Sequence, residues 1–205
     1  MLVEDSDLND KSNYCIFLGI PTGSVMSAIH ATMIRTGNAI EGLIEEEIPS
    51  DKIEGEITFH KKYPKLRDGN KGIVVDMEHE DKHEIDIIEL KLGNTFDTKK
   101  APAEVDSLNK VQKHLQKVQN KKVNKYVVCY TANTHEEIKA GFKGALPSDL
   151  NILTGREFAE KYYFEYENLL VKLAEKRIEN QEFLLNYFIK NMDQKVVRKV
   201  IENAI

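Results

Sequence analysis

Charged residues interrupt two apolar, β-branched runs in the middle of this 205-residue chain. Asp76 stands in GIVVDM, and Glu89 and Lys91 stand in IDIIELKL, with twelve residues between Asp76 and Glu89. Alternation along a strand places Glu89 and Lys91 on one face and Leu90 on the other. For the Glu-x-Lys pattern alone, a solvent-facing strand is the simpler interpretation. If helices cover the strand, a buried glutamate and lysine require a partner or a metal ion.

A polar turn from Glu80 to Lys82 separates the two runs, and this pattern predicts a β-hairpin that brings Asp76 near Glu89. Two carboxylates a few ångströms apart repel each other, and a hard divalent cation such as Mg²⁺ relieves that repulsion. We therefore expect a Mg²⁺ site formed by Asp76 and Glu89. Lys91 beside it could orient or deprotonate a water molecule that attacks a phosphodiester.

The segments before the hairpin predict helices and one edge strand. Ser24 is expected to cap a helix through VMSAIHATMIRTG, and a second helix is expected over 38–47, ended by Pro49. The segment 53–69 mixes strand-forming residues with a polar turn, which is typical of an edge strand followed by a loop. These elements would precede the hairpin on one side of a sheet.

The segments after the hairpin alternate between helix and strand. Apolar residues three and four apart predict a helix in APAEVDSLNKVQKHLQKVQ, and the run KYVVCYTA predicts a central strand covered on both faces. A short helix in THEEIKAGF and a strand leading into a helix in DLNILTGREFAEKYY follow. The order predicts an α/β fold with a mixed central sheet flanked by helices.

The last forty residues are almost entirely helix-compatible. We therefore expect a core over 1–163 and a helical C-terminal extension over 164–205, which would serve as a dimerisation arm or as a cap on the core.

Composition indicates a globular chain, with 41% apolar and 31% charged residues and a net charge of −5. The absence of a long apolar stretch and the acidic start favour a cytoplasmic protein. Cys15 and Cys129 stand in apolar runs without metal-ligand spacing, so buried free thiols are expected. The acidic balance argues against nucleic-acid binding over the whole surface, although the stretch 99–125 holds eight lysines against Glu104 and Asp106.

Asp76 followed by Glu89-x-Lys91 across a hairpin, then a helix and a strand, resembles the PD-(D/E)xK nuclease superfamily. The resemblance implies a restriction-endonuclease-like fold and Mg²⁺-dependent hydrolysis of double-stranded DNA. Members carry a further acid on an earlier helix, and RTGNAIEGLIEE resembles that element, which would assign this role to Glu41; an exposed acid early in a helix is the alternative. Val75 stands where the motif has proline.

The run ELKLGNTFDTKKAPAEVDSL is similar to the MjaI-type type II restriction endonucleases, which implies cleavage at a specific sequence. Cutting both strands needs two active sites, so a homodimer is expected. The candidate phosphate contacts are lysines that follow the motif: Lys99, Lys100, Lys110 and Lys113.

Three alternatives remain at the level of the sequence. Asp86 with Asp97 and Lys99 satisfies the same motif in another register. A structure-specific or repair nuclease of the same fold would share the chemistry. A non-catalytic nucleic-acid-binding protein would carry the Glu-x-Lys pattern as a solvated strand.

Overall fold

The computed structural model describes residues 11–66, 72–93, 101–142 and 146–191, together with 198 and 202. The chain divides into two compact units, one over Glu41–Tyr166 and one formed by Met1–Ile40 with Glu167–Ile205. Among the described helices, none combines the length and apolar character needed to cross a membrane.

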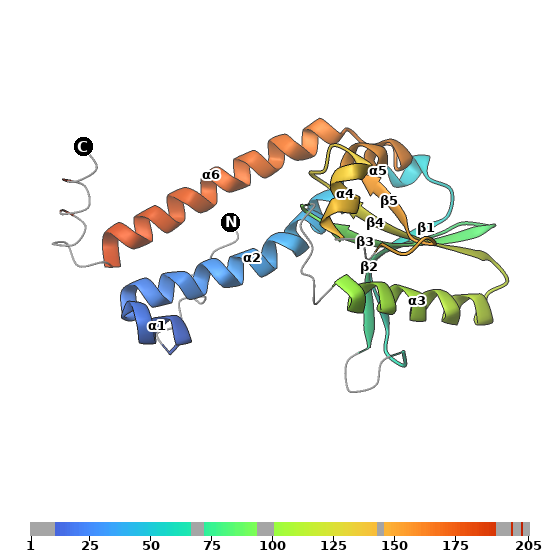
Figure 1. Ribbon diagram of the computed structural model, residues 1–205. Helices are drawn as coiled ribbons and strands as arrows, with labels where there is room; N and C mark the ends of the chain where they lie inside the picture. The colour runs from blue at the N-terminus through green and yellow to red at the C-terminus, as the bar shows by residue number, and fades with distance from the viewer. Residues whose placement is uncertain are drawn as a thin grey trace. The chain divides into compact units, whose positions relative to one another are not determined.

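The larger unit is built on a five-stranded mixed sheet (Figure 1). The strands lie side by side in chain order, with antiparallel pairing from the first to the third and parallel pairing from the third to the fifth. Their bounds are β1 Glu56–Tyr63, β2 Ile73–Glu80, β3 Glu84–Lys91, β4 Lys122–Cys129 and β5 Asn151–Thr154.

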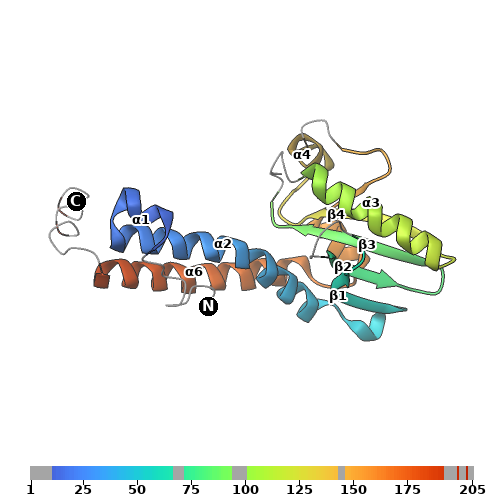
Figure 2. The same ribbon diagram turned by 90° about the horizontal axis from the view of Figure 1, so that it is seen from below.

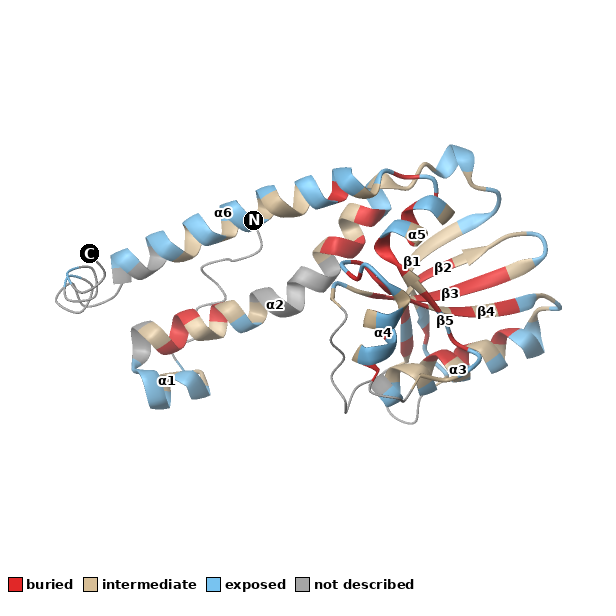
Figure 3. Ribbon diagram, turned by 45° about the horizontal axis from the view of Figure 1, so that its top comes forward, coloured by how far each residue is buried: buried red, intermediate tan, exposed pale blue. Residues whose placement is uncertain are grey.

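Helix α3 (Ala101–Val118) packs on one face of this sheet, against β4 and β2 (Figure 2). Its apolar residues Leu108, Val111 and Leu115 are buried in one cluster with residues of β2, β3 and β4. Helix α4 (His135–Gly141) adds Ile138 to the same cluster. Helix α5 (Gly155–Lys161) covers the other face, so β3 is buried on both sides (Figure 3).

The expected mixed sheet flanked by helices is confirmed, and so are the hairpin, the helix after it and the alternating elements that follow. The hairpin could be predicted because a polar turn separates two runs that are rich in β-branched residues. Helix α3 was readable because its apolar residues recur with helical spacing. Strand β1 lies at the edge of the sheet, as the sequence predicted.

The N-terminal prediction of two separate helices is wrong. The structure has a short helix α1 (Asn13–Leu18) and one 28-residue helix α2 (Ile20–Glu47). Pro21 lies in the first turn of α2, where a missing N–H breaks no helical hydrogen bond. Ser24 is consequently inside the helix and does not cap it. The backbone continues through Gly37 because one glycine costs about 1 kcal/mol in a helix, which the flanking turns offset.

The C-terminal segment contains helix α6 (Tyr166–Asn191). The predicted division after residue 163 lies close to the end of the larger unit at Tyr166. The smaller unit also takes in the first forty residues, which the sequence did not indicate. Cys129 is buried, whereas Cys15 is partly buried; both are free thiols.

Candidate active site

Strands β2 and β3 separate at the position of Asp76. Their last paired residues in this direction are Met77 and Ile88, and one further step would set Asp76 opposite Glu89. Here a side chain replaces the backbone as hydrogen-bond acceptor: the Leu90 backbone N–H donates to Asp76 Oδ2 at 2.8 Å. The sheet thus opens at this point, and a carboxylate fills the opening.

Lys91 connects β3 to helix α3. Its Nζ lies 2.6 Å from Glu89 Oε1 and 3.0 Å from Glu104 Oε1. The Glu89 side chain is 15% exposed and that of Lys91 is 27% exposed, so the pair is not a solvated strand face. Glu104 belongs to the first turn of α3 and was not among the predicted site residues. Its position in the helix that directly follows the motif was the available signal.

Glu41, on the part of α2 that belongs to the larger unit, is a fourth acid near this site. It is buried, and its Oε2 lies 3.2 Å from Nδ1 of His60 on β1. Burial raises its pKa, the negative charge of Glu89 raises it further, and Lys91 lowers it. Because Glu41 is buried, the alternative of an exposed helical acid is wrong, whereas its role beside the motif residues stays a prediction.

The pKa values of Asp76 and Glu89 are both raised to about 7. Burial is the largest cause for each; the charge of Glu41 comes second for Asp76, and the charge of Asp76 comes second for Glu89. Lys91 lowers both pKa values and is itself held as a cation, because Glu89 and Glu104 raise its pKa. Carboxylates in such a field are poised to exchange protons for a metal ion.

Asp76 and Glu89 both line a cleft of about 520 Å³. Glu104 and Ser107 of α3 form one wall, and Lys62 of β1 stands at the same cleft. The acids are therefore reachable from outside, with a cation on β1 near them. Such a concave site with titratable groups of shifted pKa is typical of an active site.

Asp76 and Glu89 form the oxygen donor set that this site offers to a divalent cation. Among the residues that the structure describes, no group of three or more His, Cys, Asp or Glu side chains stands ready to hold a metal ion. Mg²⁺, however, is usually held by one or two carboxylates, with water and substrate phosphate completing its shell. Asp76 and Glu89 supply two hard oxygen donors whose repulsion such an ion would relieve, so they fit Mg²⁺.

The predicted phosphate contacts are only partly described. Lys99 and Lys100 lie outside the described residues, as does Asp97 of the other register. Lys110 on α3 is half exposed and pairs with Asp106 at 2.9 Å. Lys113 on the same helix is exposed.

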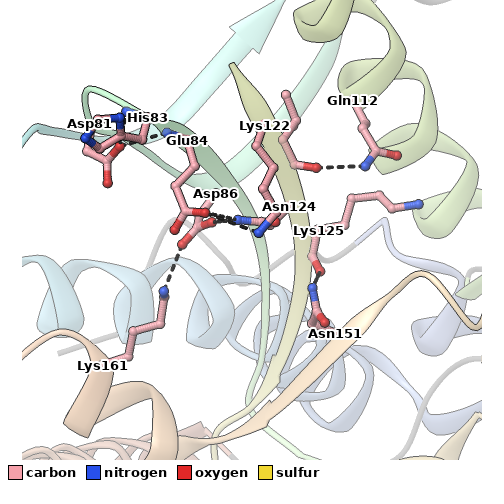
Figure 4. Close-up of polar contacts among 11 residues, drawn as sticks. Asp81, His83, Glu84, Asp86, Gln112, Lys122, Asn124, Lys125, Asn151 and Lys161 are labelled. Carbon is pink, nitrogen blue, oxygen red and sulfur yellow. Dashed lines mark hydrogen bonds and ion pairs between the residues drawn. The ribbon is translucent and has the colours of Figure 1, made fainter.

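Asp86, the strand acid of the other register, belongs to a separate network on the opposite face of β3 (Figure 4). Its Oδ2 lies 3.0 Å from Lys161 Nζ of α5, and its Oδ1 accepts a hydrogen bond of 2.7 Å from Asn124 Nδ2 of β4. Both carboxylate oxygens are thus occupied, and the side chain is 2% exposed. This arrangement ties α5 to the sheet.

Comparison with known proteins places the chain in a family. No family model matches it. It is 30% identical over 192 residues to the type II restriction enzyme HhaII of Haemophilus parahaemolyticus, and the alignment covers 82% of this chain and 83% of that protein. The chain therefore belongs to the family of type II restriction enzymes that includes HhaII.

Proposed function

We propose that the chain is a Mg²⁺-dependent, site-specific endonuclease that hydrolyses phosphodiester bonds of double-stranded DNA, with an active site of the PD-(D/E)xK type. The observation that carries the proposal is the convergence of Asp76 and Glu89 at one cleft, with the Lys91 ammonium 2.6 Å from Glu89. Membership of a type II restriction enzyme family supports the same reaction and substrate.

Asp76 and Glu89 would hold the metal ion. Bound there, Mg²⁺ would supply positive charge to the phosphate oxygens and to the attacking water. The hydrogen bond from the Leu90 N–H to Asp76 fixes one carboxylate, and the ion pair with Lys91 fixes the other. Both carboxylates are therefore oriented by residues of β3 before any ligand arrives, which lowers the ordering cost of binding.

Lys91 would act as a cation that orients the water and offsets charge on the phosphate. A raised pKa makes it a poor proton acceptor in this arrangement, so orientation is the role that its surroundings favour over proton abstraction. Glu104, whose Oε1 lies 3.0 Å from Lys91 Nζ, would keep the Lys91 ammonium in place from the α3 side if Glu89 turned toward a metal ion.

The face of α3 would carry phosphate contacts next to this site. Lys110 and Lys113 are solvent-facing on the helix whose first turn supplies Glu104. Phosphate contacts of this kind position a duplex without reading its sequence.

A homodimer is proposed as the active form, because cleavage of both strands at one site needs two centres. Helix α6 supports it: Val171, Ile178 and Leu185 recur every seven residues and are 58%, 54% and 61% exposed. Apolar residues at this spacing favour helix pairing.

Sedimentation of wild type and of Ile178→Glu tests the proposed homodimer. Wild type is expected to be a dimer that Ile178→Glu converts to a monomer, and a monomeric wild type would contradict the proposal.

The experiment that tests the proposed function is digestion of a mixed-sequence plasmid with Mg²⁺ and with EDTA. Discrete fragments that need Mg²⁺ are expected. Cutting confined to junctions or damaged sites would instead indicate a structure-specific or repair nuclease. An intact plasmid that shifts in a gel in both Mg²⁺ and Mn²⁺ would indicate a non-catalytic DNA-binding protein.

A further inference from the structure

Strand β1 is interrupted at one residue, His60. Phe59 pairs with Met77 and Lys61 pairs with Val75, so the same register sets His60 opposite Asp76, where the pairing is missing. His60 has φ +52°, in the left-handed region that residues with a Cβ rarely adopt. Backbone strain of this kind persists where the surrounding structure enforces it, and it gathers at functional sites.

The unusual backbone conformation of His60 accompanies a side-chain contact between β1 and α2. His60 Nδ1 lies 3.2 Å from Oε2 of Glu41, whose side chain is 10% exposed. A regular strand residue facing Asp76 would continue the pairing of β1 with β2. At His60 the ladder is broken, and the imidazole contacts the acid from α2. Both residues belong to the larger unit.

Glu41 needs such a partner because it stands in the field of two other acids. The charges of Glu41 and Asp76 interact, as do those of Glu41 and Glu89. Repulsion would turn a free glutamate side chain away from them. A hydrogen-bond donor from β1, such as the His60 ring 3.2 Å away, would hold the Glu41 carboxylate in place.

We propose that His60 is a positioning residue, which holds the Glu41 carboxylate toward Asp76 and Glu89, the two acids that would bind the divalent cation. The inference rests on the proposed function, since it assigns a role within that metal site. It requires an N–H at Nδ1, which both the Nδ1-protonated neutral ring and the imidazolium provide. Partners that orient metal-site acids typically affect metal affinity by about 10- to 100-fold.

His60→Gly separates this role from a purely structural one. Glycine adopts the left-handed conformation without strain, so this variant should melt at the same or a higher temperature than wild type. It nevertheless removes the donor to Glu41. Mn²⁺ affinity, measured at fixed pH from the EPR signal of free Mn²⁺, should fall by about tenfold or more. His60→Asn tolerates the same backbone and carries an amide donor, so it should recover most of the affinity.

Two further variants complete the design. Tyr163→Gly removes a second left-handed residue, at φ +59°, away from the acids, so it should leave Mn²⁺ affinity unchanged. Glu41→Gln should lower the affinity, and adding His60→Gly to it should lower it no further, because the two residues act as one unit.

The outcomes distinguish this proposal from the proposed function. Mn²⁺ binding and DNA cleavage by wild type, together with unchanged Mn²⁺ affinity in His60→Gly, would overturn the role of His60 alone. Equal losses in His60→Gly and Tyr163→Gly would also overturn it, since relief of strain would then be the cause. A wild-type protein that binds no Mn²⁺ and cuts no DNA would overturn both proposals.

Discussion

Asp76 and Glu89 are brought together at a cost to the stability of the metal-free protein. Burial raises the pKa of each carboxyl group to about 7, from ordinary values of 3.8 and 4.5, with added repulsion from Glu41 at Asp76 and from Asp76 at Glu89. The folded protein therefore binds more protons at these two groups than the unfolded chain does between about pH 4 and pH 7. Its free energy of unfolding should lose stabilisation from this pair as the pH rises through that window.

This pH dependence of the free energy of unfolding can be tested in the absence of metal. The difference in melting temperature between the variant Asp76→Asn/Glu89→Gln and wild type should grow from pH 5 to pH 8, because only wild type accumulates the repelling charges. Mg²⁺ should raise the wild-type melting temperature more at pH 8 than at pH 6, and should not raise that of the variant. Thermal melts across this pH range check both statements. A difference that shrinks as the pH rises would contradict the buried pair.

The sequence predicted the acids of the hairpin more fully than the residues that surround them. Asp76, Glu89 and Lys91 could be predicted to lie near one another because strand alternation and a turn signal fix their relative places. Glu104 could not be selected, since its contact with Lys91 depends on how α3 packs on the sheet. His60 could not be selected either, because its proposed role depends on a backbone conformation that the residue type does not predict.

At the scale of elements, the start of β1 depends on a close approach between the backbone of Gly55 and the backbone of β2. Gly55 has φ +107°, and a Cβ there would lie 2.3 Å from the backbone oxygen of Glu80 on β2. Gly55→Ala should therefore destabilise the protein by about 1–3 kcal/mol or more. Gly42 in helix α2 has open space around it, so Gly42→Ala should stabilise by about 0.5–1 kcal/mol.

Denaturant unfolding of the two glycine variants measures both changes. They form a matched pair, since each adds one methyl group to the larger unit. Equal effects of the two substitutions would show that the close approach of Gly55 to Glu80 does not constrain the edge of the sheet.

Helices and strands were predicted correctly where apolar residues recur at one regular spacing. The prediction failed where helix-breaking residues stand inside a helix. Helix α3 and strand β4 carry clear patterns of burial, and both were found. In α2, a proline and internal glycines indicated breaks, whereas the chain forms one helix of 28 residues. Cooperative hydrogen bonding along a long helix outweighs single unfavourable residues, and a short sequence window does not register it.

At the scale of the whole molecule, the net charge of −5 requires that DNA binding depend on local cations. If Lys110 and Lys113 contact phosphates, Lys110→Gln/Lys113→Gln should weaken binding to all duplex sequences alike. The slope of log affinity against log salt should decrease by about 1 for each lysine. Lys52→Gln, at an exposed lysine in the turn before β1, is the control.

Fluorescence anisotropy in Ca²⁺ at several salt concentrations measures these slopes. An unchanged slope in the double variant, or an equal change in Lys52→Gln, would show that α3 does not contact the backbone.

The most direct measurement compares two acids that lie three residues apart on β3, Glu89 and Asp86. DNA cleavage in Mg²⁺ and thermal melting are measured for Glu89→Gln and Asp86→Asn side by side. Glu89→Gln should lose about 100-fold or more in cleavage rate while remaining at least as stable as wild type. Asp86→Asn should retain cleavage and lose about 1–3 kcal/mol of stability, because its ion pair with Lys161 is broken. Full cleavage by Glu89→Gln, with cleavage lost in a folded Asp86→Asn, would contradict the site described above.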